Sequence, residues 1–367
     1  MYDVIVVGGG IAGLVNSILL SRSGLKVALF EKKSYPFHRV CGEYISNEVK
    51  PFLVRNELFP EELNPTEIAN FRLTSINGKQ AQLSLKMGGF GISRFSFDHY
   101  LFQQAESAGV EVYQNSVVID VRMTDDFFYV ATKSQVYETR LVIGAHGKRS
   151  VLDKTRKFMQ KKSPYLGVKY HIKTTFPDDE IALHNFQDGY CGISQVEGGI
   201  SNLCYLSHRD NLRKHKTITE MEQAVLHQNP FLKRIWNDSE FLFDEPLVIN
   251  EISFEKKELV HNHILMCGDT AGMITPLCGN GMAMAIRSAN LLSELILESW
   301  KNGRFDRQKL ETAYIKKWSQ TFAFRLWSGR EIQKLFGSKS SSNLGVSLAN
   351  VRPLGQAIVG LTHGKVF

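Results

Sequence analysis

The stretch YDVIVVGGGIAG, residues 2–13, decides the fold. Residues 2–7 are a short run rich in β-branched side chains, which is typical of a parallel strand buried on both faces. Gly8, Gly10 and Gly13 follow with the spacing GxGxxG. In this motif the first glycine permits a tight turn, the second lets the backbone approach a diphosphate, and the third lets the helix pack closely on the strand. We therefore predict a strand, a turn and a helix that bind a dinucleotide.

The residues after this turn complete a βαβ unit. We predict a helix over residues 11–23, ended by Gly24, and a second strand over residues 26–30. Glu31 follows, 18 residues after Gly13, where its carboxylate can accept hydrogen bonds from both hydroxyls of an adenosine ribose. NAD, NADP and FAD share this adenosine and diphosphate, so the motif alone does not choose among them. The binding residues expected from this unit are Gly8, Gly10, Ile11, Ala12, Gly13, Glu31 and Lys32.

A second cluster of glycines with an acid lies far down the chain and favours FAD. A nicotinamide dehydrogenase of this length would normally complete its nucleotide domain within the first half of the chain. Here residues 263–267 are predicted to form a strand that ends in Gly268 and Asp269. Ligands of doubly wound sheets bind at the carboxyl ends of the strands, where the Asp269 carboxylate can hold a ribityl hydroxyl. A helix is predicted over residues 282–300, and its N-terminus would point at the ligand. The binding residues expected from this segment are Gly268, Asp269, Pro276, Gly279, Asn280, Gly281 and Met282.

GGGIAG with Glu31, together with GDTAGMITPLCGNGMAMAIRSA at residues 268–289, resembles the FAD-dependent para-hydroxybenzoate hydroxylase and geranylgeranyl reductase superfamily. The resemblance implies that Asp269 binds the ribityl chain and that Gly279 and Gly281 approach the flavin. It also implies an α/β (α+β) fold, in which a Rossmann-like FAD-binding domain of the GR2 type is interrupted by a β-sheet substrate domain and followed by C-terminal helices. We expect the FAD-binding domain to comprise residues 1–70, 95–160 and 255–300, the β-rich substrate domain residues 71–94 and 161–254, and the helical segment residues 301–367.

Two further segments are similar to motifs of that superfamily. ISRFSFDHYL, residues 92–101, resembles a helix start whose arginine lies beside the flavin, which implies that role for Arg94; the alternative is a surface arginine. LVIGAHGKRS, residues 141–150, resembles a strand that ends in GADG and adds Ala145 and Gly147 to the expected cofactor site. His146 replaces the aspartate, which leaves NAD(P)H open as the direct reductant. We expect His146 to bond backbone at the strand end.

The loop SYPFHRVCGEYIS, residues 34–46, contains RxCGE, which is similar to the RxCGG-like segment of geranylgeranyl reductases. The resemblance places Arg39, Cys41 and Gly42 beside the cofactor, with Arg39 on the ribose or diphosphate side. Cys41 follows His38 and Arg39 and would be either a polarised thiolate or a small packed thiol.

β-Alternating runs dominate residues 163–250 and predict a sheet that roofs the cofactor, joined by residues 71–90 and 113–137. Residues 189–207 are predicted to form a hairpin with its turn at 197–199. The WxWxIP segment of flavin-dependent halogenases is missing, and of the YxWxFP segment of geranylgeranyl reductases only Tyr190 is present. The candidate substrate contacts are Tyr190, Ser194 and Gln195; the alternative is that they satisfy backbone groups.

The resemblance leaves the reaction open. We expect a monooxygenase that hydroxylates a hydrophobic aromatic or polyketide-type molecule through a flavin C4a-hydroperoxide. The alternative is a flavin-dependent reductase of C=C bonds in isoprenoid or polyketide-derived molecules, in which Cys41 or Tyr190 supplies the proton. A second alternative is a flavin-binding or electron-transfer module without catalysis.

Composition and charge limit the location and the partners. Hydrophobic residues at 43% and charged residues at 22% exclude disordered and collagen-like chains. Five scattered cysteines without a CxxC pair indicate a reducing compartment and no zinc site, so we expect a cytoplasmic protein. Residues 301–367 hold 12 Lys and Arg against 3 Asp and Glu, without a nucleic-acid recognition motif. These residues are expected to form two helices on the FAD-binding domain with a solvated basic face; the sharper hypothesis is a peripheral membrane or acyl-carrier contact.

Overall fold

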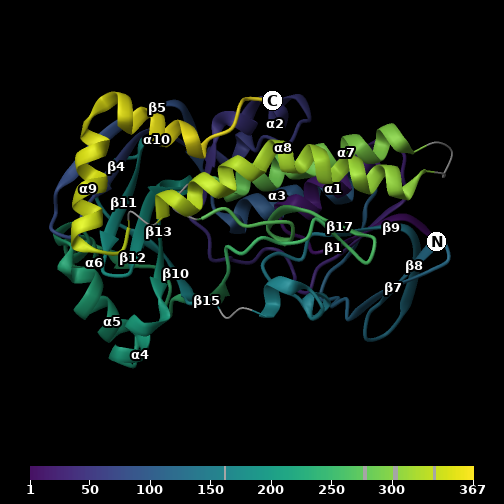
Figure 1. Cartoon of the computed structure of the whole chain (residues 1–367), viewed down its shortest axis with the longest axis horizontal. Helices are drawn as coiled ribbons and strands as arrows, with labels where there is room; N and C mark the ends of the chain where they lie inside the picture. Colours follow the sequence, from purple (N-terminus) through teal and green to yellow (C-terminus); the bar gives the residue numbers. More distant parts are fainter. Residues whose placement is uncertain (161–162, 276–278, 301–304, 334–335) are drawn as a thin grey trace.

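The computed structural model describes residues 1–160, 163–275, 279–300, 305–333 and 336–367, and within them the chain forms two β-sheets (Figure 1). In the first sheet β1 (Tyr2–Val7) lies at the centre, and Val4, Ile5 and Val6 have no exposed surface. β1 pairs in parallel with β2 (Val27–Phe30) and with β9 (Val136–Gly144). The remaining strands are β6 (Glu111–Tyr113), β17 (Ile264–Met266), β16 (Val260–His261), β8 (Phe127–Ala131) and β7 (Asp120–Thr124). The predicted strand–turn–helix–strand unit is therefore confirmed.

Four long helices pack beside this sheet. Their bounds are α1 (Ile11–Arg22), α3 (Arg94–Ser107), α7 (Gly281–Ser299) and α8 (Arg307–Gln333). α1 contacts both α3 and α7, and α7 contacts α8, as Figure 1 shows. Gly24 adopts a φ of +88° directly after α1, which explains why the helix ends there. Apolar side chains of α7 and α8, including Leu292, Tyr314 and Phe322, complete the core of this half.

The second sheet is mostly antiparallel and lies beside the first. Its strands, in spatial order, are β14 (Glu240–Phe241), β10 (Tyr165–Lys173), β13 (Ser201–His208), β12 (Gly189–Gln195), β11 (Glu180–Phe186), β4 (Thr66–Thr74), β5 (Gln80–Gly91) and β3 (Tyr44–Ser46), with β15 (Leu247–Ile252) also paired to β10. β12 and β13 form the predicted hairpin, with its turn at Glu197–Gly199.

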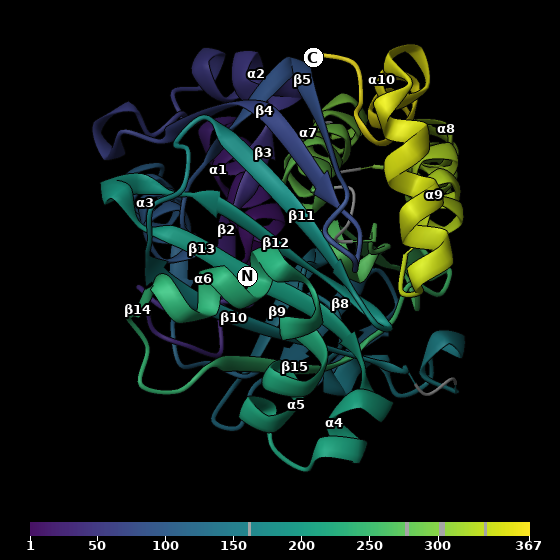
Figure 2. The ribbon, with the colours of Figure 1, turned by 90° about the vertical axis from the view of Figure 1, so that its left-hand side faces the viewer.

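Helices cover both faces of the second sheet, as Figure 2 shows. On one face lie α4 (Arg209–His215), α5 (Ile218–Val225) and α6 (Pro230–Asp238), and Met221 and Leu232 pack against the strands. On the other face lie α9 (Lys339–Asn350) and α10 (Arg352–Thr362). Val346 and Ala349 of α9 share a core with Leu83 of β5. The short helix α2 (Lys50–Arg55) follows β3.

Three expectations about the arrangement are wrong. Residues 113–137 do not join the second sheet, because β8 pairs antiparallel with β9 and carries β7 with it into the first sheet. The second sheet also begins before residue 71, since β3 and the first residues of β4 belong to it. The C-terminal helices also differ from the pair expected, because only α8 packs along the first half, whereas α9 and α10 lie on the second sheet. Alternation of apolar side chains identifies a strand but not the sheet it joins.

The contact between α1 and β1 gives a first prediction. A Cβ atom at Gly13 would overlap the carbonyl oxygen of Gly8, and this backbone contact cannot yield without moving the helix. Gly13→Val is therefore expected to destabilise the protein by about 1–3 kcal/mol or more, and to lower the amount of nucleotide that copurifies. Denaturant unfolding and absorbance spectra measure both. Gly360→Ala is the control, because among the described residues beyond its own stretch of helix nothing lies within 4 Å of the added Cβ. Equal stability of the two variants would contradict the packing argument.

Candidate active site

One cavity of about 720 Å³ runs from the glycine-rich turn of β1 to the space between the second sheet and α9–α10. Its volume lies within the roughly 300–1,000 Å³ typical of ligand sites. The predicted residues that line it are Gly8, Gly10, Ile11, Ala12, Glu31, Lys32, Arg39, Cys41, Gly42, Arg94, Ala145, Gly147, Tyr190, Ser194, Gly268, Asp269, Gly279, Asn280, Gly281 and Met282. Residues from both ends of the sequence thus meet around one space. Pro276 lies outside the described residues.

The turn after β1 lies at the carboxyl end of the first sheet. Gly8 has a φ of +109°, and a Cβ there would overlap the backbone of Ala145 at the end of β9. Gly10 faces the cavity, with the Arg94 guanidinium 3.7 Å from where its Cβ would lie. Gly13 does not line the cavity, because it lies against Gly8 within α1. The turn therefore brings bare backbone and the N-terminus of α1 to the ligand, as a diphosphate requires.

A cluster of two acids and two arginines lies beside this turn. Glu31 Oε2 accepts hydrogen bonds from the Gly9 N–H at 2.9 Å and from Arg39 Nη2 at 3.2 Å. The buried carboxylate of Asp98 accepts from Arg39 Nε at 3.0 Å and from Arg94 Nε and Nη2 at 2.6 Å. Burial disfavours the charge of Arg94, but Asp98 outweighs it and raises the pKa of Arg94. Asp98 therefore holds two charged guanidinium groups against the cavity. The i,i+4 spacing of Arg94 and Asp98 was the sequence signal for this ion pair.

The second predicted cluster lines the same cavity, and Gly268 lies against Ala12 in the first turn of α1. Asp269 follows β17, and burial raises the pKa of its carboxyl group although Lys257 nearby lowers it. Lys257 Nζ donates to the backbone oxygen of Asp269 at 2.7 Å. Gly279 has a φ of +61°, and α7 begins at Gly281 with its first N–H groups at the cavity. The glycine turn, Glu31, Asp269 and the start of α7 therefore fit an extended dinucleotide that carries a flavin.

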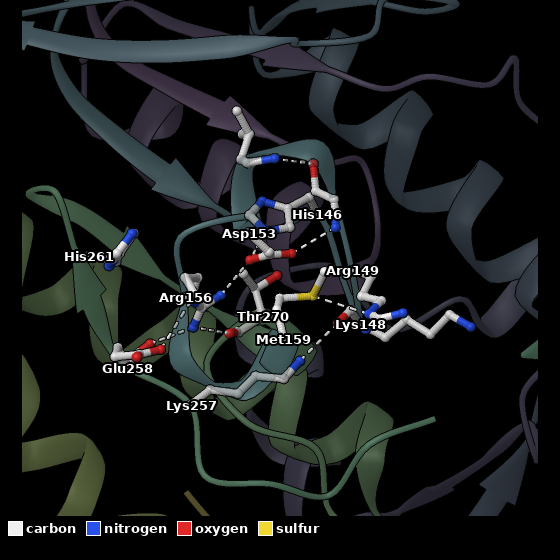
Figure 3. A network of polar contacts seen from close by, with 12 residues as sticks. His146, Lys148, Arg149, Asp153, Arg156, Met159, Lys257, Glu258, His261 and Thr270 are labelled. Carbon is white, nitrogen blue, oxygen red and sulfur yellow. Dashed lines mark hydrogen bonds and ion pairs between the residues drawn. The ribbon is translucent and has the colours of Figure 1, made fainter. Parts of the chain in front are cut away.

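His146 takes part in a buried polar network at the end of β9 (Figure 3). Its Nε2 lies 3.2 Å from Asp153 Oδ1, which also accepts a hydrogen bond from Arg156 Nη1 at 2.8 Å. Burial disfavours ionisation of Asp153, but the hydrogen bonds and charges of His146 and Arg156 outweigh it and lower the pKa of Asp153 to about 2. The expectation that the His146 side chain bonds backbone is therefore wrong, because it pairs with the Asp153 carboxylate. This contact was not predictable from the sequence, because it depends on how the loop between the two residues folds.

Thr270 joins this network to the second cluster. Its Oγ1 accepts a hydrogen bond from the Gly147 N–H at 2.8 Å and lies 3.2 Å from the Gly147 oxygen, and its backbone oxygen accepts from Arg156 Nη2 at 3.0 Å. Figure 3 shows Lys257 reaching across the same loop. The ends of β9 and β17 are thus fixed side by side.

Cys41 lies in the cavity wall between the two sheets. Asn202 Nδ2 of β13 donates to its carbonyl oxygen at 3.1 Å. Burial raises the pKa of the Cys41 thiol, and the nearby charge of Arg94 does not offset it. The hypothesis of a polarised thiolate is therefore not favoured, and Cys41 holds its proton at neutral pH.

The predicted substrate residues divide between the two faces of β12. Tyr190 and Ser194 line the cavity. Ser194 is 1% exposed, and its Oγ has no hydrogen-bond partner among the described residues. Gln195 points to the other face, where its Nε2 donates to the Phe176 oxygen at 3.0 Å. Gln195 therefore does not contact the cavity, because neighbouring residues of a strand face opposite sides.

The far end of the cavity is apolar. It is lined by side chains from the second sheet and from the C-terminal helices: Phe71, Leu73, Leu83, Leu85, Ile181, Leu183, Leu206, Ile249, Ile252, Ile332, Phe336, Ala349, Ile358 and Val359. We call this end the apolar chamber. Sequence reasoning did not find it, because its walls come from segments that are distant in the chain.

Residues 6–48 match the family of NAD(P)-binding Rossmann-like domains. The digeranylgeranylglycerophospholipid reductase of Methanocaldococcus jannaschii is 26% identical over 381 residues, covering 100% of this chain and 93% of that protein. The conditioned medium factor receptor 1 of Dictyostelium discoideum is 26% identical over 362 residues, covering 88% and 68%. The chain thus matches an NAD(P)-binding Rossmann-like model at its N-terminal end and is similar over its whole length to a digeranylgeranylglycerophospholipid reductase.

Solved structures show the same fold as this chain. The flavin-dependent brominase Bmp2 aligns with a TM-score of 0.79 and 17% identity, covering 98% of this chain and 93% of that one. A geranylgeranyl bacteriochlorophyll reductase-like protein from Thermoplasma acidophilum aligns with a TM-score of 0.76 and 19% identity, covering 96% and 92%. A variant of the halogenase PltM in complex with FAD aligns with a TM-score of 0.76 and 17% identity, covering 99% and 83%.

The chain also contains a buried ion cluster that sequence reasoning did not identify. Glu43, which replaces the second glycine of RxCGG, has no exposed surface and a φ of +53°. Its carboxylate pairs with Lys169 Nζ and lies 2.7 Å from His171 Nε2. It also accepts a hydrogen bond from the backbone N–H of Arg94 at 2.7 Å. Burial disfavours ionisation of Glu43, but Lys169 and His171 outweigh it and lower the pKa of Glu43. The cluster ties the Cys41 loop to both α3 and β10.

The substitution Glu43→Gln tests the contribution of this ion cluster to stability. The substitution leaves the fully buried Lys169 without its counter-charge, so we expect a loss of about 3–5 kcal/mol in the free energy of unfolding at pH 7. Because folding lowers the pKa of Glu43, its contribution is present above the unfolded pKa of about 4.3 and is lost as the pH falls through the folded value. The difference between wild type and variant should therefore shrink below about pH 4.

Glu67→Gln is the matched control, since the pair that Glu67 forms with Lys50 lies at the surface. It should cost less than about 1 kcal/mol. A similar small cost for Glu43→Gln would contradict the ion cluster.

Proposed function

We propose that this protein is a flavin-dependent reductase of carbon–carbon double bonds in a lipid-like molecule. One observation carries the proposal: the dinucleotide end and the apolar chamber form one continuous cavity. Cys41, a protonated thiol, lies in its wall. A reduction of this kind needs a hydride donor, a proton donor and room for an apolar chain.

The cavity indicates the substrate class. The apolar chamber is walled by aliphatic side chains of the second sheet and of α8–α10, which suits a chain of isoprenoid or acyl type. The buried hydroxyl of Ser194 faces the same cavity and has no hydrogen-bond partner in the described part of the chain, and an unsatisfied buried polar group favours a ligand that bonds it. We therefore infer a substrate with one polar group and a long apolar part.

The relatives support reduction rather than hydroxylation. The digeranylgeranylglycerophospholipid reductases of two Methanosarcina species, M. acetivorans and M. mazei, are 25% identical over 341 residues, in addition to the one from M. jannaschii. FAD, when bound and reduced, supplies a hydride. The chain's own part is to hold the dinucleotide through the Gly8–Gly13 turn and α7, to exclude water with apolar walls, and to hold a proton on Cys41 Sγ. The direct reductant that we propose is NAD(P)H.

Hydroxylation of an aromatic or polyketide-type molecule is the second candidate. Gly192 and Ser194 stand in β12 where the geranylgeranyl reductase segment YxWxFP has large apolar side chains, so this wall of the cavity is more open and more polar. A phenolic hydroxyl bonded to Ser194 would suit such a wall. Oxygen dependence separates the two reactions.

The decisive assay is anaerobic. Protein loaded with FAD and reduced by light is mixed without oxygen with a geranylgeranylated glycerolipid, and the product is analysed by mass spectrometry. We expect a product that has gained two hydrogens, together with reoxidation of the flavin. Turnover only after oxygen is admitted, with an oxygen atom in the product, would contradict reduction and support the second candidate.

Cys41→Ala tests the proposed proton source. Loss of a positioned acid typically costs about 10²–10⁴-fold in rate, so kcat should fall by at least about 10²-fold while bound FAD is retained. Cys204→Ala, which removes another thiol from the same cavity wall, should leave kcat within a few fold. Equal effects of the two substitutions would argue against a special role for Cys41.

A further inference from the structure

The C-terminal segment, residues 305–367, exposes many of the large apolar side chains found on the surface of this protein. Of 17 such residues among the described part of the chain, eight lie after residue 304: Ile315, Phe324, Trp327, Leu344, Val351, Leu354, Leu361 and Val366. Phe324 and Trp327 are 60% and 53% exposed, and their rings lie 5.8 Å apart on α8. Exposed apolar side chains that gather in one part of a surface mark a site of interaction.

The same segment carries the positive charge of the protein. Residues 301–367 have 12 Lys and Arg against 3 Asp and Glu, whereas the whole chain has 44 against 37. Residues 1–300 are therefore slightly acidic, with 32 basic against 34 acidic side chains. Lys316, Lys339 and Arg352 are exposed on α8, α9 and α10. A surface that combines aromatic and aliphatic side chains with lysine and arginine complements an anionic lipid interface.

The inner faces of these helices line the apolar chamber. Ile332 at the end of α8, Ala349 of α9 and Ile358 of α10 contribute to its wall. α10 packs against both α8 and α9, and Figure 2 shows the three helices together at one side of the molecule. The helices are thus apolar on the side of the chamber and partly apolar on the side of solvent. Only a thin layer of helix separates the chamber from this outer surface.

We propose that the outer surface of α8–α10 docks on an anionic membrane and that the lipid substrate passes from the bilayer into the apolar chamber beneath it. The passage of substrate rests on the proposed function, whereas the docking does not. None of the described helices is both long and apolar enough to cross a membrane. The contact is therefore one of interfacial side chains, with Phe324 and Trp327 in the lipid and the basic residues on the headgroups.

The test is cosedimentation of the full chain with lipid vesicles. Vesicles of equal parts phosphatidylcholine and phosphatidylglycerol should bind the protein, and vesicles of phosphatidylcholine alone should bind it at least about tenfold more weakly. Added salt should weaken the anionic binding. The tryptophan emission should shift to shorter wavelength on binding, and this shift should be lost in a Trp327 variant.

Matched variants locate the contact. Phe324→Ser with Trp327→Ser, and separately Lys339→Glu with Arg352→Glu, should each reduce anionic vesicle binding at least about tenfold. The controls are Tyr129→Ser with Val136→Ser, and Lys133→Glu with Lys154→Glu, which change exposed residues elsewhere and should leave binding unchanged. Equal binding by all four variants would overturn the docking surface.

Other occupants of this surface give distinct results. A dimer in lipid-free solution that dissociates in the Phe324/Trp327 variant would overturn the proposal in favour of a second copy of this chain. Binding to an acidic acyl-carrier protein without binding to anionic vesicles would overturn it in favour of that carrier. If vesicles bind but no lipid is reduced, the docking stands and the proposed reaction fails. Reduction of detergent-dispersed lipid without vesicle binding supports the reaction and overturns the docking.

Discussion

The backbone contact between Gly8 and Gly13 is the constraint on which the site depends. It allows α1 to begin directly at the carboxyl end of β1, with no side chain between the helix and the turn. Ala145 at the end of β9 packs on the same turn, so two strands that are far apart in sequence end at one point. A dinucleotide bound there meets unpaired N–H groups. Arg94 reaches the same point because α3 packs on α1, and Glu31 and Arg39 reach it from the end of β2 and the loop that follows.

Buried charges connect this cofactor site to the second sheet. Asp98 fixes Arg39 and Arg94, and Glu43 pairs with Lys169 and His171 of β10. Charges removed from water cost free energy unless they are well paired, so these clusters are weak sources of stability. Their evident role is to fix geometry: they hold the loop that carries Cys41 between α3 and β10. The apolar chamber then begins where these polar contacts end.

Local patterns were sufficient for much of the fold. The GxGxxG turn, the helix after it and the β12–β13 hairpin follow from spacing, glycine and alternation within short stretches. The positions of β7, β8, α9 and α10 were not predictable in this way, because each depends on pairing with a distant segment. In the site, two motifs were sufficient to predict many of the residues that line the cavity. Lys169, His171 and Asp153, the partner of His146, could not, because a buried charged side chain and a surface one look alike in sequence. For Asp98 the only signal was its i,i+4 spacing from Arg94. For Gln195 the alternative holds, because its side chain donates to a backbone oxygen away from the cavity, and the choice between the two depended on which face of the strand it occupies.

If this cavity holds a flavin dinucleotide, the native protein should carry one, and the identity of its bound nucleotide tests this. Purified protein is denatured, and the released small molecules are identified and quantified by mass spectrometry against the protein concentration. We expect FAD at up to one molecule per chain, and incubation with FAD should fill the chains that lost it during purification. Release of NAD or NADP instead, or a chain that takes up no FAD on reconstitution, would contradict it.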